Sequence, residues 1–206
     1  MKCPVSILLA LLGAAQWIAV PGSPASDHFS ADNWFLPAVS QTPTDPYEQA
    51  VQLALEGKSL AATRKLYVIL QHHPADSTLQ RMMRDVYDLL TVSEKRRLQH
   101  SPNPQRWLLR FWRRNDPTPA TLENERFVEH CRRLQHARKY FSSPQPRGYD
   151  DRGMIYVRYG EPEERYVSEM ADYTRDNESW VYHRLGEVAF DFVSYGGTFR
   201  LEEDLW

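Results

Sequence analysis

Two adjacent carboxylates in the C-terminal half are the first candidates for chemistry in this sequence. Asp150 and Asp151 lie between Gly148 and Gly153, so they occupy a short stretch that contains glycine. Paired carboxylates on a loop attract Ca²⁺, but calcium takes about six to eight oxygen ligands, and no repeated acidic spacing supplies them here. We therefore favour a structural loop. A hydrolase that uses these carboxylates, or a glutamate near Glu161, is the alternative.

The second acidic group follows Tyr159-Gly160. Glycine and proline set the backbone of a tight turn, and the glutamates on either side of Pro162 are expected to stay solvated. General acid–base catalysis needs a carboxylate in a shielded pocket that shifts its pKa, which neighbouring glutamates in a turn do not suggest. A turn is favoured, with an acidic docking edge as the functional alternative.

Cys131 and its neighbour His130 raise the question of a nucleophile and its base. Phe127, Cys131 and Leu134 recur at helical spacing, so the thiol should point into a core. Adjacent helical residues point about 100° apart, so we expect His130 to face elsewhere. The histidines show no zinc-ligand spacing, and there is no nucleophile elbow or phosphate-binding glycine loop. We therefore assign no catalytic residue, no metal and no cofactor.

Arginines and aromatic residues are interleaved between Gln105 and Arg114. The set consists of Arg106, Trp107, Arg110, Phe111, Trp112, Arg113 and Arg114. This mixture could grip nucleic acid or anionic lipid headgroups. It is more typical of a helix with aromatic residues inward and arginines extending outward. Contact of its basic edge with a membrane surface is the better functional alternative, and the formal net charge of −2 does not favour nucleic acid.

The N-terminal residues show the three parts of a secretory signal peptide. Lys2 gives a positive start, residues 5–20 are apolar, and residues 21–25 supply a helix break and small residues for cleavage near Ala25. The apolar stretch is shorter than the ~20 residues of a membrane span, and a retained anchor is the alternative. Cys3 precedes that stretch, so it is not the lipidated cysteine of a lipoprotein. We expect an exported protein, periplasmic or secreted, in which Cys131 is unpaired after cleavage.

The middle of the chain reads as a leader followed by helices. Residues 26–46 are rich in Ser, Pro, Thr and Asp and predict a flexible leader, with Trp34-Phe35-Leu36 as a docking cluster. Residues 47–100 carry three apolar runs at helical spacing, and Gly57 and Pro74 are suited to separate them. The spacing from Gly57 to Pro74 resembles the second helix of a tetratricopeptide repeat over one repeat at most, and a generic antiparallel helix pair is the alternative.

Beyond the proline-containing break at 101–104 we expect helices first and strands afterwards. A short helix should run from Gln105 to Arg114, and a longer one, capped by Thr121, to about Phe141. Alternating apolar residues predict strands at 154–159, around Trp180 and Tyr182, and at 188–192. The predicted fold is α+β, with N-terminal antiparallel helix pairs followed by a long helix and a small, mainly antiparallel sheet.

Several ordered blocks lie between Arg110 and Val193: Arg110-Phe-Trp-Arg-Arg-Asn-Asp-Pro-Thr-Pro, Glu123-Asn-Glu-Arg126, Gly148-Tyr-Asp-Asp-Arg-Gly153 and Ile155-Tyr-Val-Arg-Tyr-Gly-Glu-Pro162. In this order they resemble the GWxTD domain of bacterial exported proteins. The motif here is one residue shorter than the family's five. Gly148 and Asp151 keep its glycine and aspartate, Tyr149 replaces the Trp, and Asp150 stands where the Thr would be. The resemblance implies export and the domain type, and it transfers no catalytic residue.

The sequence therefore predicts a non-enzymatic protein-interaction or scaffolding module of the bacterial cell envelope. We place the GWxTD-like domain at 105–206 and expect an envelope or secreted protein as partner, which could pair with an exposed sheet edge. We expect no nucleic acid, and the oligomeric state stays open. The candidate interaction residues are Gly148, Tyr149, Asp150, Asp151, Arg152, Gly153, Tyr159, Gly160, Pro162, Trp180 and Tyr182.

Overall fold

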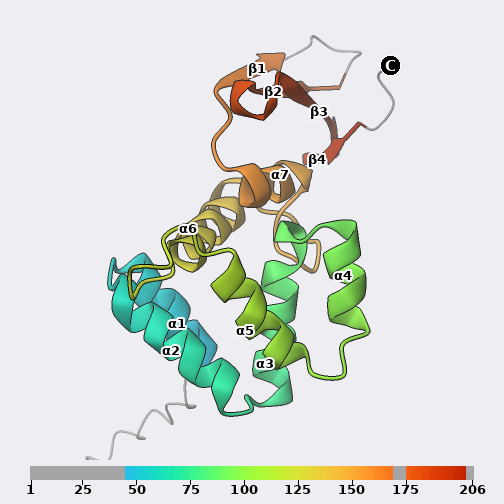
Figure 1. The fold of residues 1–206 in the computed structure, drawn as a ribbon. Coiled ribbons are helices and arrows are strands. Elements are labelled where there is room, and N and C mark those ends of the chain that lie inside the picture. The colour runs from blue at the N-terminus through green and yellow to red at the C-terminus, as the bar shows by residue number, and fades with distance from the viewer. Residues whose placement is uncertain (1–44, 169–174, 203–206) are drawn as a thin grey trace, which may run out of the picture. The chain divides into compact units, whose positions relative to one another are not determined.

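The computed structural model describes residues 45–168 and 175–202, and the predicted signal peptide and leader, including residues 34–36, lie outside them. Seven α-helices precede a four-stranded sheet in this part of the chain, which confirms the predicted α+β class (Figure 1). The elements are α1 (Pro46–Leu55), α2 (Ser59–Gln71), α3 (Asp76–Val86), the 3₁₀ turn η1 (Tyr87–Leu89), α4 (Val92–Gln99), α5 (Pro104–Arg114), α6 (Glu125–Tyr140), α7 (Asp151–Tyr159), β1 (Glu164–Ser168), β2 (Asn177–Tyr182), the 3₁₀ turn η2 (His183–Leu185), β3 (Val188–Tyr195) and β4 (Thr198–Leu201).

The first helices begin and end where the sequence indicates. Asp45 caps α1 by accepting a hydrogen bond from the Tyr47 amide at 2.8 Å, and Pro46 occupies the first turn. Gly57 has φ of 78° in the three-residue connection to α2, a conformation that glycine adopts without steric cost. Ala50, Ala54 and Ala62 are fully buried, so α1 and α2 pack closely as a hairpin. No helix in the described ranges is long and apolar enough to cross a membrane.

Helix α6 joins two apolar cores. Phe127 and Cys131 belong to the core formed with α1–α5, whereas Leu134 and Ala137 belong to the core formed with α7 and the sheet. Helices α1 and α2 cover one part of α6 and α7 covers another. Because α6 is enclosed in this way, His130 is buried as well as Cys131, with 1% of its surface exposed.

The cap of α6 also differs from the prediction. Asn124, not Thr121, is the capping residue, and its Oδ1 accepts a hydrogen bond from the Phe127 amide at 2.8 Å. Asn124 is completely buried, and its own amide donates to Thr63 Oγ1 at 2.9 Å. Thr121 instead lies in the preceding turn, where its hydroxyl donates to Glu125 at 3.0 Å.

The segment predicted as the first strand is the helix α7. Ile155 and Val157, which suggested alternation, point about 200° apart on a helix, yet both are buried. They can both be buried because α6, η1 and β4 all pack against α7. A nine-residue helix enclosed on several sides therefore shows the same two-residue spacing of apolar side chains as a half-buried strand.

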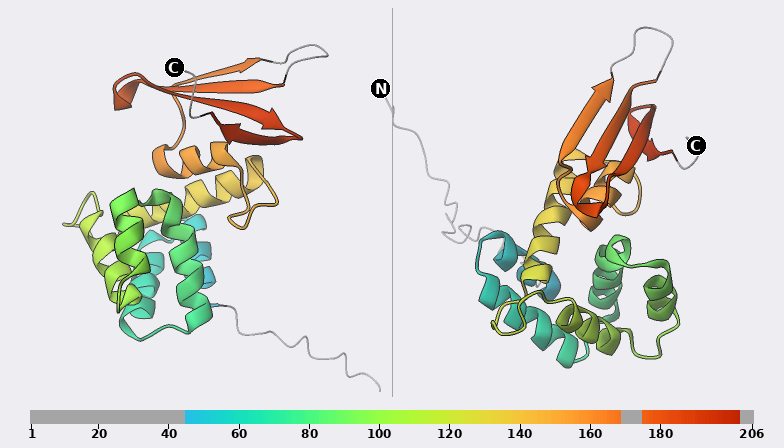
Figure 2. Two further views of the ribbon diagram at one scale, coloured as in Figure 1. Left: turned by 90° about the vertical axis from the view of Figure 1, so that its right-hand side faces the viewer. Right: turned by 45° about the horizontal axis from the view of Figure 1, so that its top comes forward.

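The other two predicted strands are confirmed as β2 and β3. The sheet is antiparallel with the order β1-β2-β3-β4, and β2 places Glu178, Trp180 and Tyr182 on its buried face. Phe190 pairs with Trp180 in the register of β2 and β3. Gly186, in the left-handed conformation, lies between these two strands as expected. Figure 2 shows α7 and the end of α6 beneath the sheet.

Candidate functional site

Asp150, the first candidate carboxylate, caps α7. Its Oδ1 accepts hydrogen bonds from the amides of Arg152 at 3.0 Å and Gly153 at 3.3 Å, and the residue is 1% exposed. Its Oδ2 lies 2.8 Å from Nη2 of Arg152. Aspartate, which stands here in place of the threonine of the family motif, is like threonine a residue type that caps helices well.

The two motif carboxylates also bind the edge of the sheet. Phe199 and Leu201 lie two residues apart on β4, so their amides point the same way. The Phe199 amide donates to Asp150 Oδ2 at 3.3 Å, and the Leu201 amide donates to Asp151 Oδ2 at 2.9 Å. Because the other side of β4 pairs with β3, these carboxylates occupy amides that an edge strand otherwise exposes.

Tyr149, at the position of the motif Trp, connects the loop to the helical part. Its hydroxyl donates to Asp88 Oδ2 at 3.0 Å, and the ring is buried. Arg158 Nε donates to the Asp88 carbonyl at 2.9 Å, and Arg147 lies 3.7 Å from the Asp88 carboxylate. Burial raises the pKa of the Tyr149 hydroxyl, and the Asp88 charge raises it further. The hydroxyl is thus a stable donor rather than an acid.

A charge-balanced cluster lies between α7 and the sheet. Glu178 is 2% exposed and accepts hydrogen bonds from Arg152 at 3.0 Å, from the Trp180 indole and from Arg165. Burial alone would raise the pKa of Glu178, but these three donors outweigh burial and lower it. The Arg152 guanidinium also lies 3.6 Å from the centre of the Phe199 ring. Each charge of the cluster therefore has a partner, as buried charges require.

The Tyr159–Pro162 turn ends α7 and ties it to the sheet. Gly160 has φ of 81°, and its carbonyl accepts a hydrogen bond from the Tyr182 hydroxyl at 2.9 Å. The Tyr159 ring stacks on Phe190 at a centroid distance of 5.5 Å. Arg184 donates to the carbonyl of Tyr159 at 2.6 Å. These contacts, like those of Asp150, hold the backbone in place.

A hollow of about 240 Å³ adjoins this turn. Rings and charged groups from α6, α7, β1 and β2 line it: His136, Tyr140, Phe141, Arg152, Tyr156, Glu161, Pro162, Arg165 and Trp180. Burial and the nearby Glu161 raise the pKa of Tyr156, and burial lowers the pKa of His136. Asp150 and Asp151 are not in the lining, so the structure does not bring the motif carboxylates together with Glu161 in one cleft.

Cys131 and His130 do not form a nucleophile and base. Burial and the charge of Asp85 raise the pKa of the Cys131 thiol, and burial followed by the charge of Arg126 lowers the pKa of His130 to about 3. A reactive cysteine needs its thiolate, which this environment opposes. Asp85 is itself buried and accepts a hydrogen bond from Arg138 at 2.5 Å. In the part of the chain that the structure describes, no three His, Cys, Asp or Glu residues are grouped to hold a metal.

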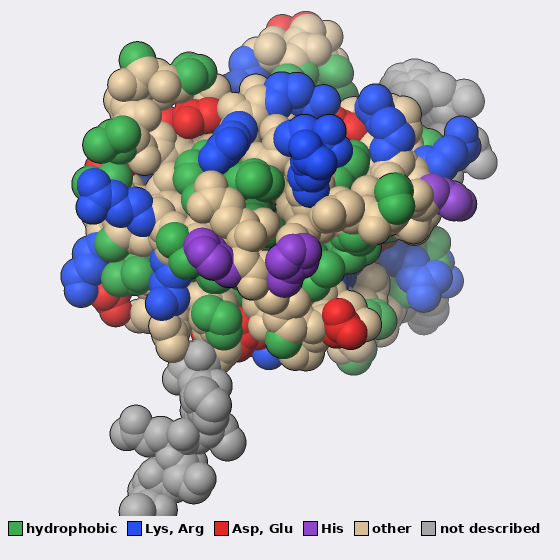
Figure 3. All heavy atoms as spheres, turned by 60° about the horizontal axis from the view of Figure 1, so that its bottom comes forward, with side chains coloured by type: hydrophobic (Ala, Val, Ile, Leu, Met, Phe, Trp, Pro, Cys, Tyr) green, Lys and Arg blue, Asp and Glu red, His purple; other side chains and the backbone are tan. Residues whose placement is uncertain are grey.

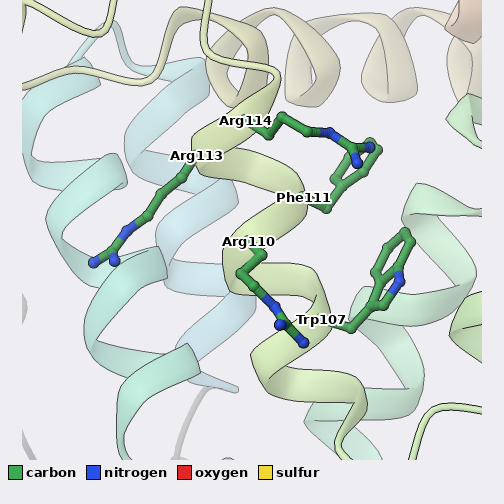
Figure 4. Close-up of a pocket in the computed structure, with 5 residues that line it drawn as sticks. All are labelled: Trp107, Arg110, Phe111, Arg113 and Arg114. Atoms are coloured by element: carbon green, nitrogen blue, oxygen red, sulfur yellow. The ribbon is translucent and has the colours of Figure 1, made fainter.

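Helix α5 has its aromatic and basic residues arranged as predicted. Phe111 and Trp112 are buried, and Trp107 is half-buried and stacked on Phe111 at 5.4 Å. The arginines Arg106, Arg110, Arg113 and Arg114 are exposed. A wide hollow of about 580 Å³ lies along this helix, lined by the residues that Figure 4 labels.

Residues 53–203 match the GWxTD domain. The match takes in the helices from the end of α1 onward as well as α7 and the whole sheet. No curated protein and no solved structure matches the chain.

Proposed function

The chain belongs to the GWxTD domain family, and we propose that it is a non-enzymatic, exported protein-interaction module of the bacterial cell envelope. The partner would be an envelope or secreted protein that contributes an extended segment to the sheet at β1. Strand addition uses main-chain hydrogen bonds for affinity and neighbouring side chains for selectivity.

The observation that carries this proposal is the difference between the two edges of the sheet. At β4 the carboxylates of Asp150 and Asp151 accept the amides of Phe199 and Leu201. At the opposite edge, β1 has β2 as its only neighbouring strand among the described residues. The family motif thus covers one edge and leaves the other for pairing.

The side chains of β1 suit a selective partner. Tyr166 and Val167 are 58% and 57% exposed, on opposite faces of the strand, and offer apolar contact to an added strand. Glu164 and Arg165 precede them, and charged residues on an edge discourage indiscriminate pairing. A partner strand with complementary charges would therefore pair better than an arbitrary one.

The hydrolase alternative is disfavoured by the contacts of the candidate carboxylates. Asp150 is occupied by helix amides, by Arg152 and by β4, and Asp151 is paired with Arg147 and β4. A general base must reach the substrate proton that it accepts, and the contacts of these two carboxylates leave little room for a substrate beside them.

Site-specific photocrosslinking in the native host tests the proposal with the full chain. A photoreactive amino acid at position 167 is expected to give one or a few discrete adducts with envelope proteins. The matched control is position 122, because Leu122 is 73% exposed but lies in the loop before α6. Adducts of the same identity and yield from both positions, or none from position 167, would contradict strand addition at β1.

A second arm uses charge to block the edge. Tyr166→Lys combined with Val167→Lys should abolish the adduct formed from a probe at Ser168, because a lysine-rich edge resists pairing. Leu122→Lys combined with Val92→Lys, two other exposed apolar residues, should leave it unchanged. An adduct with a second copy of this chain would show that β1 mediates self-association, and it would overturn the proposal of a different protein as partner.

A further inference from the structure

The strongest charge asymmetry of the described residues lies on α4 and α5. Residues 92–114 carry seven Lys or Arg and one acidic residue, Glu94, whereas the whole chain has 25 Lys or Arg against 27 Asp or Glu. The seven are Lys95, Arg96, Arg97, Arg106, Arg110, Arg113 and Arg114. We call these seven residues the basic face. All but Lys95 are exposed, and Figure 3 shows Lys and Arg side chains gathered around apolar ones on the face that it draws.

Part of the basic face is not neutralised by acidic neighbours. Arg114 pairs with Glu94, with Nη2 and Oε1 2.5 Å apart, and Arg113 lies over the Tyr67 ring at 5.3 Å. Among the described residues, no ion pair of the structure includes Arg106 or Arg110. The hydrogen-bond donors of these two guanidinium groups are therefore available for a partner.

Aromatic side chains lie directly beside these charges. Figure 4 shows Trp107, Phe111 and Arg114 pointing to one side of α5 and Arg113 to the other, with Arg110 beside the hollow. Trp107 is half-buried and one of its faces is covered by Phe111. Two aromatic rings and three arginines line the hollow, a combination that suits a phosphate group joined to an apolar body.

We propose that the basic face binds the anionic surface of a phospholipid membrane, with headgroup phosphates held by Arg110 at the hollow and by Arg106 one helical turn before it. One guanidinium group can donate two parallel hydrogen bonds to two oxygens of a phosphate. Tryptophan favours the membrane–water interface. The formal net charge of −2 for the whole chain does not favour nucleic acid as the partner. This surface is separate from β1, so it adds to the proposed function rather than depending on it.

Vesicle binding by the full chain tests the proposal. Vesicles that contain phosphatidylglycerol should bind the protein at low salt and release it as salt is raised, beyond any binding to neutral phosphatidylcholine vesicles. Arg106→Gln combined with Arg110→Gln should weaken the anionic component about 25-fold, roughly fivefold for each arginine. The matched control is Arg132→Gln combined with Arg200→Gln, which removes the same charge from exposed positions outside the basic face.

Two results would overturn the proposal. One is equal binding of both double variants to anionic vesicles, which would show that only net charge matters. The other is tight, arginine-dependent binding to a short DNA duplex without binding to anionic vesicles. Near-unchanged circular dichroism and thermal midpoints of the variants would show that both remain folded, since all four arginines are exposed.

Discussion

The hydrogen bond from the Tyr149 hydroxyl to the buried Asp88 carboxylate can be removed alone by replacing Tyr149 with phenylalanine. Asp88 is buried, and the phenolic hydrogen bond at 3.0 Å is one of the few contacts of its carboxylate. We expect Tyr149→Phe to lower the free energy of unfolding by about 2 kcal/mol, because a buried acceptor loses its donor. Tyr195→Phe, which removes an exposed hydroxyl bonded to Glu202, is the control and should cost under about 0.5 kcal/mol. Urea denaturation measures both, and equal costs would refute the role of this bond.

The lowered pKa of the buried Glu178 carboxyl group makes the stability of the protein depend on pH. Its pKa is lowered from 4.5 in the folded protein, despite burial, by hydrogen bonds from Trp180, Arg165 and Arg152. A lowered folded pKa means that this stabilisation is complete above pH 4.5 and is lost as the pH falls through the folded value. The free energy of unfolding should therefore fall as the pH is lowered below 4.5. In Glu178→Gln this fall should be smaller, and an identical fall would exclude Glu178 as its cause.

Single residues were predictable where a local pattern marks them. The motif pointed to Asp150, and its capping bonds reach only two and three residues ahead. Asp88 and Glu178 were missed, because their partners Tyr149 and Arg152 lie 61 and 26 residues away in the chain. An isolated acidic residue carries no sequence signal of a distant partner, so only the fold identifies such contacts.

At the scale of elements, the helix α7 depends on a close approach that requires glycine. A Cβ atom built on Gly153 would lie 2.7 Å from side-chain atoms of Tyr149, closer than such atoms pack. Alanine normally favours a helix over glycine by up to about 1 kcal/mol. Here we expect Gly153→Ala to destabilise the protein by about 1 to 3 kcal/mol, because overpacking outweighs that gain.

Thermal or urea unfolding of this variant measures the balance of the two effects. Gln80→Ala, at an exposed position on α3, is the matched control for helix propensity and should change stability little. A Gly153→Ala protein as stable as the wild type, or more so, would show that the Tyr149 ring moves aside without cost.

The same element shows why part of the fold could not be predicted. The helices α1, α2, α3, α5 and α6 were predictable because their apolar residues recur at helical spacing. Helix α4 was not predicted as a separate helix, since Leu98 is its only buried residue. Helix α7 is enclosed by three elements, so its buried residues no longer follow that period, and Ile155 and Val157 resembled a strand. The strands β2 and β3 kept a clear alternation because helices cover only one face of the sheet.

At the scale of the whole described structure, hydrogen bonds join the helical core to the core beneath the sheet. Arg138 on α6 bonds to Asp85 on α3, and Arg158 on α7 donates to the Leu90 carbonyl at 2.7 Å. Together with the bond of Tyr149 to Asp88, they connect elements that contribute to different cores. We therefore expect the two cores to unfold together in a single transition.

The Cys131 thiol offers a direct measurement of that coupling. It is fully buried on α6, so a thiol reagent should reach it only after α6 separates from the helices packed on it. In a Cys3→Ser background, which leaves Cys131 as the only thiol, labelling should be slow in the folded protein and fast in urea. If reclosing is faster than labelling, the labelling rate follows the population of the open form. Tyr149→Phe, at about 2 kcal/mol, should then raise that rate about 30-fold, although Tyr149 belongs to the other core. A rate that this substitution leaves unchanged would mean that α6 opens locally and that the two cores unfold independently.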